Sequence, residues 1–200
     1  MSEKRRTTKA EQREATTQLL IQVAREMFAK AGYGGTATED IVQQAGVTRG
    51  ALYHHFGSKE GLFAAVLEAT QQDVARRIDE ASAQTDDLWE QLLAGCRAFL
   101  AASLDPHVQR IMLIDAPAVL GWEAWRKLDE AHSMRMLRDL LGELRLQGVI
   151  RAVPLDALAH LLSGAMNEAA LWIARADQPE KALHEATTTL ETLLLALKQV

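Results

Sequence analysis

The chain has 200 residues, 48% of them hydrophobic, and a formal net charge of −5 at pH 7, which suits one or two small domains with a sizeable core. It contains no apolar run of the roughly 18–20 residues that a membrane span needs, and its charged start excludes a secretory signal. The single cysteine, Cys96, excludes an intramolecular disulfide and favours a reducing cytoplasm.

The charge is unevenly distributed along the chain. Residues 1–60 hold nine basic and seven acidic residues, whereas the remaining residues hold 13 basic and 20 acidic ones. This asymmetry is typical of a chain in which one end meets phosphate groups. Residues 1–13 show no apolar period and are predicted to form a disordered basic arm, which either lies along nucleic acid or is simply solvated. Its positive charges are Lys4, Arg5, Arg6, Lys9 and Arg13.

Three helices are predicted between residues 14 and 58. The first spans Ala15–Ala31 on its apolar spacing. The second begins at Thr38 and stops at Gly46, because glycine accepts the left-handed backbone of a tight turn. Thr48 caps a third helix that Gly57 closes. A helix, a glycine turn and a second helix at this size predict a helix-turn-helix that binds the DNA major groove.

The outward face of the third helix supports this hypothesis. Hydrogen-bonding, stacking or small residues remain there once the buried ones are assigned, as expected where a recognition helix meets base edges and phosphates. They are Thr48, Arg49, Gly50, Tyr53, His54 and His55. Arg49 is predicted to reach a guanine edge. The alternative is an ordinary helical hairpin.

The rest of the chain is predicted to be helical as well. A long helix from Lys59 to about Ala83 joins the two units without a flexible linker, and a short helix spans His107–Asp115. Pro117 is expected to break that helix and to leave Ala116–Gly121 irregular, with room for a ligand beside it. Further helices are predicted over 122–147, from Pro154 and from Pro179. No strand pattern or repeat is present, so we predict an all-α chain of about nine helices.

The chain resembles the tetracycline-repressor (TetR) family of bacterial regulators at the helix-turn-helix. The resemblance covers about the first third of the chain. It rests on Thr38, on the run from Ala45 to Leu62 (AGVTRGALYHHFGSKEGL), and on Ala24, Phe28, Gly32, Tyr33 and Thr36 upstream. It implies a DNA-binding domain at 14–58 and a helical ligand-binding and dimerisation domain at 59–200. It also implies that Thr38, Tyr53, His55 and Lys59 match phosphate-contacting positions.

The resemblance further implies that the last two helices pair with their copies across a two-fold axis. Small residues on these helices allow close approach, namely Ala157, Ala159, Gly164, Ala165, Ala169 and Ala170. A two-fold dimer presents two recognition helices to a palindromic operator in double-stranded DNA. We expect this dimer to depend on Leu190 and Leu194. The alternative is that both faces are intramolecular core.

A small-molecule pocket is expected in the second domain, mostly from the resemblance. Aromatic walls with a few polar groups are typical of such sites, and an acidic group beside indole rings suits a cation. The candidate lining residues are Asp115, Trp122, Trp125, His132, Met166 and Asn167. Each has the alternative role of a core residue or a local partner.

The most consistent hypothesis is a homodimeric, ligand-responsive regulator, most simply a repressor released from DNA by a small hydrophobic effector. A ligand-free architectural DNA-binding protein is the alternative. An enzyme ranks third, because the sequence lacks HExxH, paired cysteines, a Walker loop and G-x-S-x-G. No catalytic residue, cofactor or metal site is predicted, since adjacent His54 and His55 diverge by about 100° around a helix.

Overall fold

A computed structural model describes residues 8–199, in which every extended regular element is a helix. The predicted all-α class is therefore confirmed. The elements are α1 (Lys9–Gly35), α2 (Thr38–Ala45), α3 (Arg49–Phe56), α4 (Lys59–Ser82), α5 (Leu88–Ala102), the π-helical segment η1 (Val108–Asp115), α6 (Ala116–Leu120), α7 (Trp122–Ala131), α8 (Ser133–Leu146), α9 (Leu155–Arg175) and α10 (Pro179–Leu195). No helix in the described range is long and apolar enough to cross a membrane.

Helix α1 starts earlier than predicted. Thr8 Oγ1 accepts a hydrogen bond from the Glu11 backbone N–H at 3.2 Å, and the Glu11 carboxylate accepts one from the Thr8 N–H at 2.7 Å. This reciprocal capping box fixes the start of the helix. The prediction of a disordered arm is thus wrong for residues 9–13, and residues 1–7 lie outside the described range.

Helices α1 to α3 form the predicted helix-turn-helix unit. At Gly46 the backbone takes φ 65° and ψ 29°, the left-handed conformation that turns the chain from α2 into α3. The Thr48 hydroxyl accepts from the Ala51 N–H at 3.2 Å and caps α3. Phe28 of α1 packs edge-on against Phe63 of α4, with ring centroids 5.2 Å apart. The core of the unit therefore extends into α4.

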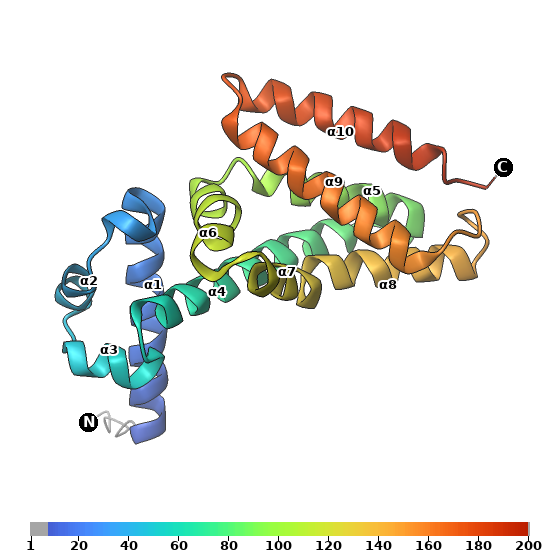
Figure 1. The fold of residues 1–200 in the computed structure, drawn as a ribbon. Coiled ribbons are helices and arrows are strands. Elements are labelled where there is room, and N and C mark those ends of the chain that lie inside the picture. Colours follow the sequence, from blue (N-terminus) through green and yellow to red (C-terminus); the bar gives the residue numbers. More distant parts are fainter. Residues whose placement is uncertain (1–7, 200) are drawn as a thin grey trace, which may run out of the picture.

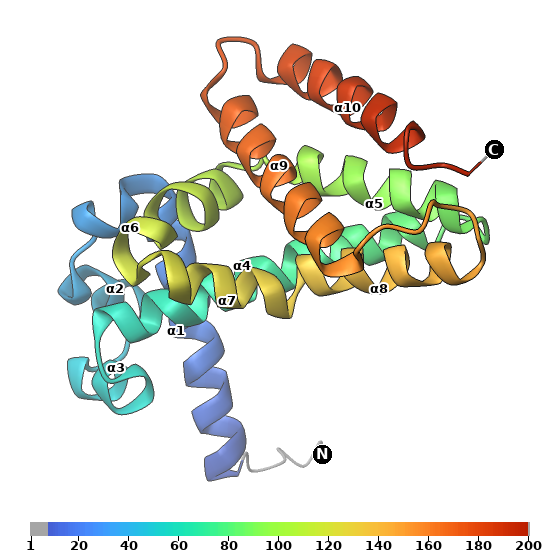
Figure 2. The same ribbon diagram turned by 45° about the vertical axis from the view of Figure 1, so that its right-hand side comes forward.

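Helix α4 belongs to both parts of the molecule. It leaves the helix-turn-helix unit and runs into the larger domain, where α5 packs along it (Figure 1). The turned view shows α7 and α8 following one another along the same helix (Figure 2). The 24 residues of α4 have no break, so the two parts share one rigid element without a flexible linker.

Two predicted helix boundaries in the larger domain are wrong. Pro117 does not break the helical region between η1 and α6. It lies in the first turn of α6, where a backbone N–H forms no hydrogen bond within the helix. The break comes instead at Gly121, with φ 83°. The predicted helix over 122–147 is divided at His132, whose φ of −118° and ψ of −101° separate α7 from α8. These divisions raise the helix number above the predicted nine.

The last two helices form an antiparallel hairpin at the far end of the molecule from α3 (Figure 1). Their inner faces pack on the domain, and Leu194 and Ile173 are fully buried. Their outer faces keep large apolar side chains exposed, namely Leu161, Trp172, Leu193 and Leu195. An isolated β-bridge between Ile150 and Lys198 fastens the end of the chain.

Candidate nucleic-acid interface and internal cavity

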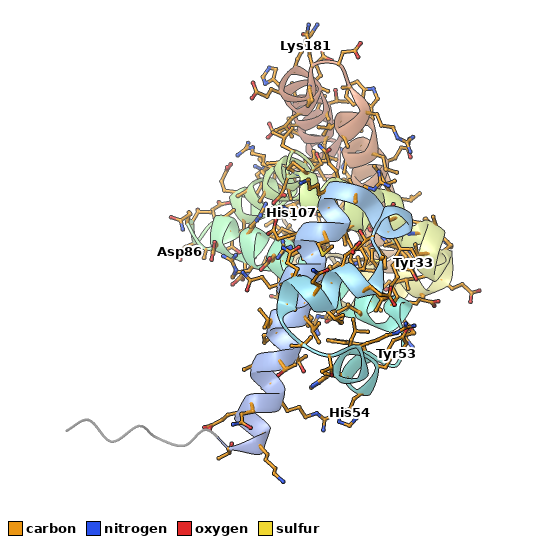
Figure 3. The ribbon with its side chains drawn as sticks, turned by 90° about the vertical axis from the view of Figure 1, so that its left-hand side faces the viewer. Tyr33, Tyr53, His54, Asp86, His107 and Lys181 are labelled. Carbon is orange, nitrogen blue, oxygen red and sulfur yellow. The ribbon has the colours of Figure 1, made fainter. Side chains whose placement is uncertain are left out.

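The exposed face of α3 presents Arg49, Tyr53 and His54 to solvent. Figure 3 looks at this end of the molecule and shows Tyr53 and His54 at its outer edge, remote from Lys181 of α10. Arg49 Nη1 lies 2.7 Å from the Glu39 carboxylate of α2, and Nη2 donates to the Tyr53 hydroxyl at 3.3 Å. The guanidinium is therefore held on the surface by contacts with one residue of α2 and one of α3.

Three further candidates lie at helix starts. Thr48 is exposed but uses its hydroxyl to cap α3. At Gly50 the only neighbour of an added Cβ would be Thr48 Oγ1, 3.9 Å away. The packing of the free protein therefore does not require glycine there, and the hypothesis of close approach by DNA remains untested. Thr38, the first residue of α2, is buried.

His55 and Lys59 are half-buried and contact other helices of the unit, unlike the exposed Arg49, Tyr53 and His54. His55 Nδ1 lies 3.0 Å from Thr17 Oγ1 and ties α3 to α1. Lys59 Nζ donates to the Tyr33 carbonyl at 2.6 Å and lies 4.1 Å from the centroid of the Tyr33 ring. Burial lowers the pKa of Lys59. In the free protein both side chains brace the helix-turn-helix unit.

Asp115 lies at the junction of the two units, where its hydrogen bonds go to α1 and to Arg110. Its Oδ2 accepts from the Tyr33 backbone N–H at 2.7 Å and from Arg110 Nε at 3.1 Å. Arg110 covers Gly32, where φ is 74° and an added Cβ would lie 2.0 Å from Arg110 Nη2. Only glycine fits this contact. The end of η1 is thereby fastened to the end of α1.

A partly open cavity of ≈ 180 Å³ lies among α4, α5 and the helices α7 to α9. Its wall is mainly apolar and rich in thioethers, with a few polar groups. The lining residues are Ile78, Asp79, Ser82, Gln91, Leu92, Gly95, Cys96, Phe99, Asp129, Ser133, Met134, Met136, Leu137, Leu140, Ser163 and Met166. Burial raises the pKa of Cys96 to about 12, so this thiol stays protonated at neutral pH.

The polar part of the wall centres on Asp129, which is only 1% exposed. Its Oδ2 accepts from Arg126 Nη1 at 2.7 Å, from Ser163 Oγ at 3.2 Å and from Asn167 Nδ2 at 3.3 Å. Burial raises the pKa of this carboxyl, and the charge of Arg126 opposes that rise. The Asn167 Oδ1 atom is buried with no hydrogen-bond partner among residues 8–199.

Of the six predicted ligand residues, Met166 alone lines this cavity. Asn167 stands behind Asp129, and His132 Nε2 lies 2.8 Å from a Glu68 carboxylate oxygen. Trp125 is buried and donates to the Met112 carbonyl at 2.9 Å. Trp122 packs on it, with ring centroids 4.9 Å apart, but is 64% exposed. Trp125 therefore ties α7 to η1, and Trp122 packs on the Trp125 ring.

Sequence reasoning missed Asp129 and Ser163, although both carried a signal. Asp129 follows the buried Trp125 by one helical turn, and Ser163 stands four residues before Asn167 on a largely apolar helix. Polar residues in an apolar row mark positions where a buried group needs a partner. The pattern shows that they are buried. It does not show that they face each other.

Comparisons with known proteins cover both parts of the chain. The model described as "Bacterial regulatory proteins, tetR family" matches residues 20–66, and the "Tetracyclin repressor-like, C-terminal domain" model matches residues 89–197. The HTH-type transcriptional repressor AcnR of Corynebacterium efficiens is 28% identical over 153 residues, which cover 75% of this chain and 77% of AcnR.

Solved structures give the same result. The crystal structure of a TetR-family transcriptional regulator from Pectobacterium atrosepticum is 40% identical, with a TM-score of 0.81, covering 97% of this chain and 99% of that one. RolR in complex with resorcinol has a TM-score of 0.71 at 21% identity, covering 92% and 90%. The likeness to RolR concerns the fold.

Proposed function

The chain belongs to the TetR family of bacterial regulatory proteins, and on that premise we propose that it is a homodimeric transcriptional repressor. A small, mainly apolar effector enters the internal cavity, and the dimer then leaves a palindromic operator. The resemblance seen at residues 38–62 is thus a family relationship. The relatives are named as regulators, and we propose no catalytic role. The protein would act in the cytoplasm, where its operator lies.

Helix α4 is the observation that carries this proposal. Its first turns pack in the core of the helix-turn-helix unit through Phe63, and its last turns line the cavity through Ile78, Asp79 and Ser82. A ligand that prefers one arrangement of the cavity helices therefore biases the position of α3 through a continuous helix. An architectural protein without a ligand would have no need of a cavity with a buried carboxylate.

The outer faces of α9 and α10 support the homodimer. Trp172 and Leu193 are exposed beside a groove between the two helices. Exposed apolar patches of this kind mark protein interfaces. Leu194 is fully buried and Leu190 nearly so, which makes both part of the protomer core. Charges at these two leucines would therefore disturb the protomer itself. We propose instead that the dimer contact depends on Trp172 and Leu193.

Operator binding and dimerisation can be tested together. Duplexes selected from a random library by the purified protein should contain two inverted half-sites. Leu193→Glu should yield a folded monomer that no longer binds them at micromolar concentration. Leu146→Glu, which alters an exposed leucine of α8, is the matched control and should behave as the unmutated dimer. A monomeric unmutated protein in light scattering would refute the proposal.

The response to an effector needs a separate test. Leu140→Trp places a large ring against the cavity wall, so this variant should bind the operator normally and ignore every effector that releases the unmutated protein. Operator binding by fluorescence anisotropy, with and without effector, measures both properties. Equal release of both proteins would place the effector site elsewhere.

A further inference from the structure

We propose that the effector is a compact apolar amine, bound as a cation whose ammonium group donates to Oδ1 of Asp129. This inference rests on the proposed function, since it assigns the ligand class of the same cavity. It is argued from the hydrogen bonding of Asp129, from the charges of the wall and from the nature of the apolar surface.

Asp129 offers one unused acceptor to the cavity. The three hydrogen bonds that Asp129 accepts, from Arg126, Ser163 and Asn167, all end on Oδ2. For Oδ1 the described residues supply no hydrogen-bond donor, although the residue is almost completely buried and lines the cavity. A ligand that displaces water from the cavity has to supply a donor to this oxygen, because a carboxylate oxygen left without one in an apolar site is costly.

The charges of the wall favour a cation over an anion. Two lining residues are acidic, Asp79 and Asp129, and none of the lining residues is Lys, Arg or His. Arg126 stands behind Asp129, where its guanidinium also meets Ser163 Oγ at 3.0 Å, Met134 Sδ at 3.3 Å and His160 Nδ1 at 3.2 Å. A carboxylate ligand would therefore meet two acidic lining residues and no basic one.

The remaining wall selects a small and soft apolar body. Met134, Met136 and Met166 supply adaptable thioether contacts, and Phe99 supplies the only aromatic ring of the wall. The cavity of ≈ 180 Å³ is smaller than the roughly 300–1,000 Å³ typical of drug-sized ligands. One ring or a short branched chain beside the ammonium group fills such a space.

Three probes of one shape separate cation, neutral donor and anion: benzylamine, benzyl alcohol and benzoate. Calorimetry on the unmutated protein without DNA should show that benzylamine binds at least about tenfold more tightly than benzyl alcohol, and that benzoate does not bind. Equal binding of the alcohol, preference for benzoate, or no binding of the amine at about 10 mM would overturn the inference. This ranking needs no variant and stands even where a substitution at Asp129 impairs folding.

Variants then locate the ammonium group. Asp129→Asn should weaken benzylamine binding at least about tenfold and leave benzyl alcohol unchanged. Asp139→Asn, which removes an exposed carboxylate of α8 outside the cavity wall, should change the affinity for either probe less than about threefold. Retention of the preference for benzylamine in Asp129→Asn would refute the assignment to Asp129.

Operator release keeps the two proposals distinguishable. Amine binding that needs Asp129 but leaves operator affinity unchanged supports the ligand class and refutes the proposed function. Release by a neutral or anionic compound, unaffected in Asp129→Asn, supports the proposed function and refutes the ligand class.

Discussion

The helix-turn-helix unit and the cavity-bearing domain place their functional side chains in opposite ways. The exposed face of α3 comes from one run of eight residues, so its members are neighbours in sequence as well as in space. The cavity wall comes from helices spread between Ile78 and Met166. A site on the outside of one helix follows from local periodicity, whereas a cavity between helices depends on which helices pack together and at what angle.

The two tryptophans of α7 test whether burial decides the cost of a substitution in the cavity-bearing domain. Trp125 should show the largest effect of the substitutions described here. Trp125→Ala removes a buried ring and its hydrogen bond to Met112, so the free energy of unfolding should fall by about 3–5 kcal/mol. Trp122→Ala, on the exposed neighbour, removes only the contact between the two rings and should lower it by less than about 1.5 kcal/mol. Urea unfolding measures the free energy of unfolding of both variants. Similar losses of stability in the two would mean that burial does not explain the difference between Trp122 and Trp125.

Arg49 tests whether the exposed face of α3 contributes to DNA binding and not to stability. Arg49→Ala removes a solvent-facing guanidinium, so stability should hold while operator affinity falls about tenfold to a hundredfold. The preference for guanine at one position of each half-site should become weaker. Anisotropy with specific and random duplexes makes the measurement. Equal weakening on both duplexes would make Arg49 a phosphate contact instead of a base contact.

Lys59 sharpens the comparison, because the resemblance matches it to a phosphate contact while its side chain points inward. Lys59→Met leaves the Tyr33 carbonyl without this donor, and we expect a loss of about 1–2 kcal/mol in stability. The salt dependence of DNA binding should stay unchanged. Lys30→Met, on the exposed surface of α1, is the stability control. A slope lowered by about one unit would restore Lys59 as a phosphate contact.

Asp115 tests the junction between the two regions and carries the smallest expected effect. Asp115→Asn weakens the contacts to Arg110 and the Tyr33 N–H. Ligand binding and DNA binding should each change little, while the coupling between them falls by about 0.5–2 kcal/mol. Asp86→Asn, at an exposed loop position, serves as control. Unchanged coupling in the Asp115 variant would show that α4 alone transmits the signal.

The sequence predicted the helix-turn-helix almost to the residue because glycine turns and caps are local features. It placed Arg49, Tyr53 and His54 on the surface, but it did not show that His55 and Lys59 turn toward Thr17 and Tyr33, which lie far away in the chain. The pocket hypothesis depended on Pro117, which instead fits the first turn of α6. Asp115 was predicted to line a pocket with the tryptophans because it is close to them in sequence. In the structure its carboxylate accepts a hydrogen bond from Tyr33 of α1 instead.

Helix α4 also acts as a lever whose length the sequence sets. Asp79, at the cavity, follows Lys59 by about 20 residues, which is about 30 Å along an α-helix. A tilt of about 5° at the cavity end moves the other end by roughly 3 Å, the length of one hydrogen bond. Under the proposed function, a molecule small enough for this cavity would therefore displace α3 from a base edge while every helix keeps its own hydrogen bonds.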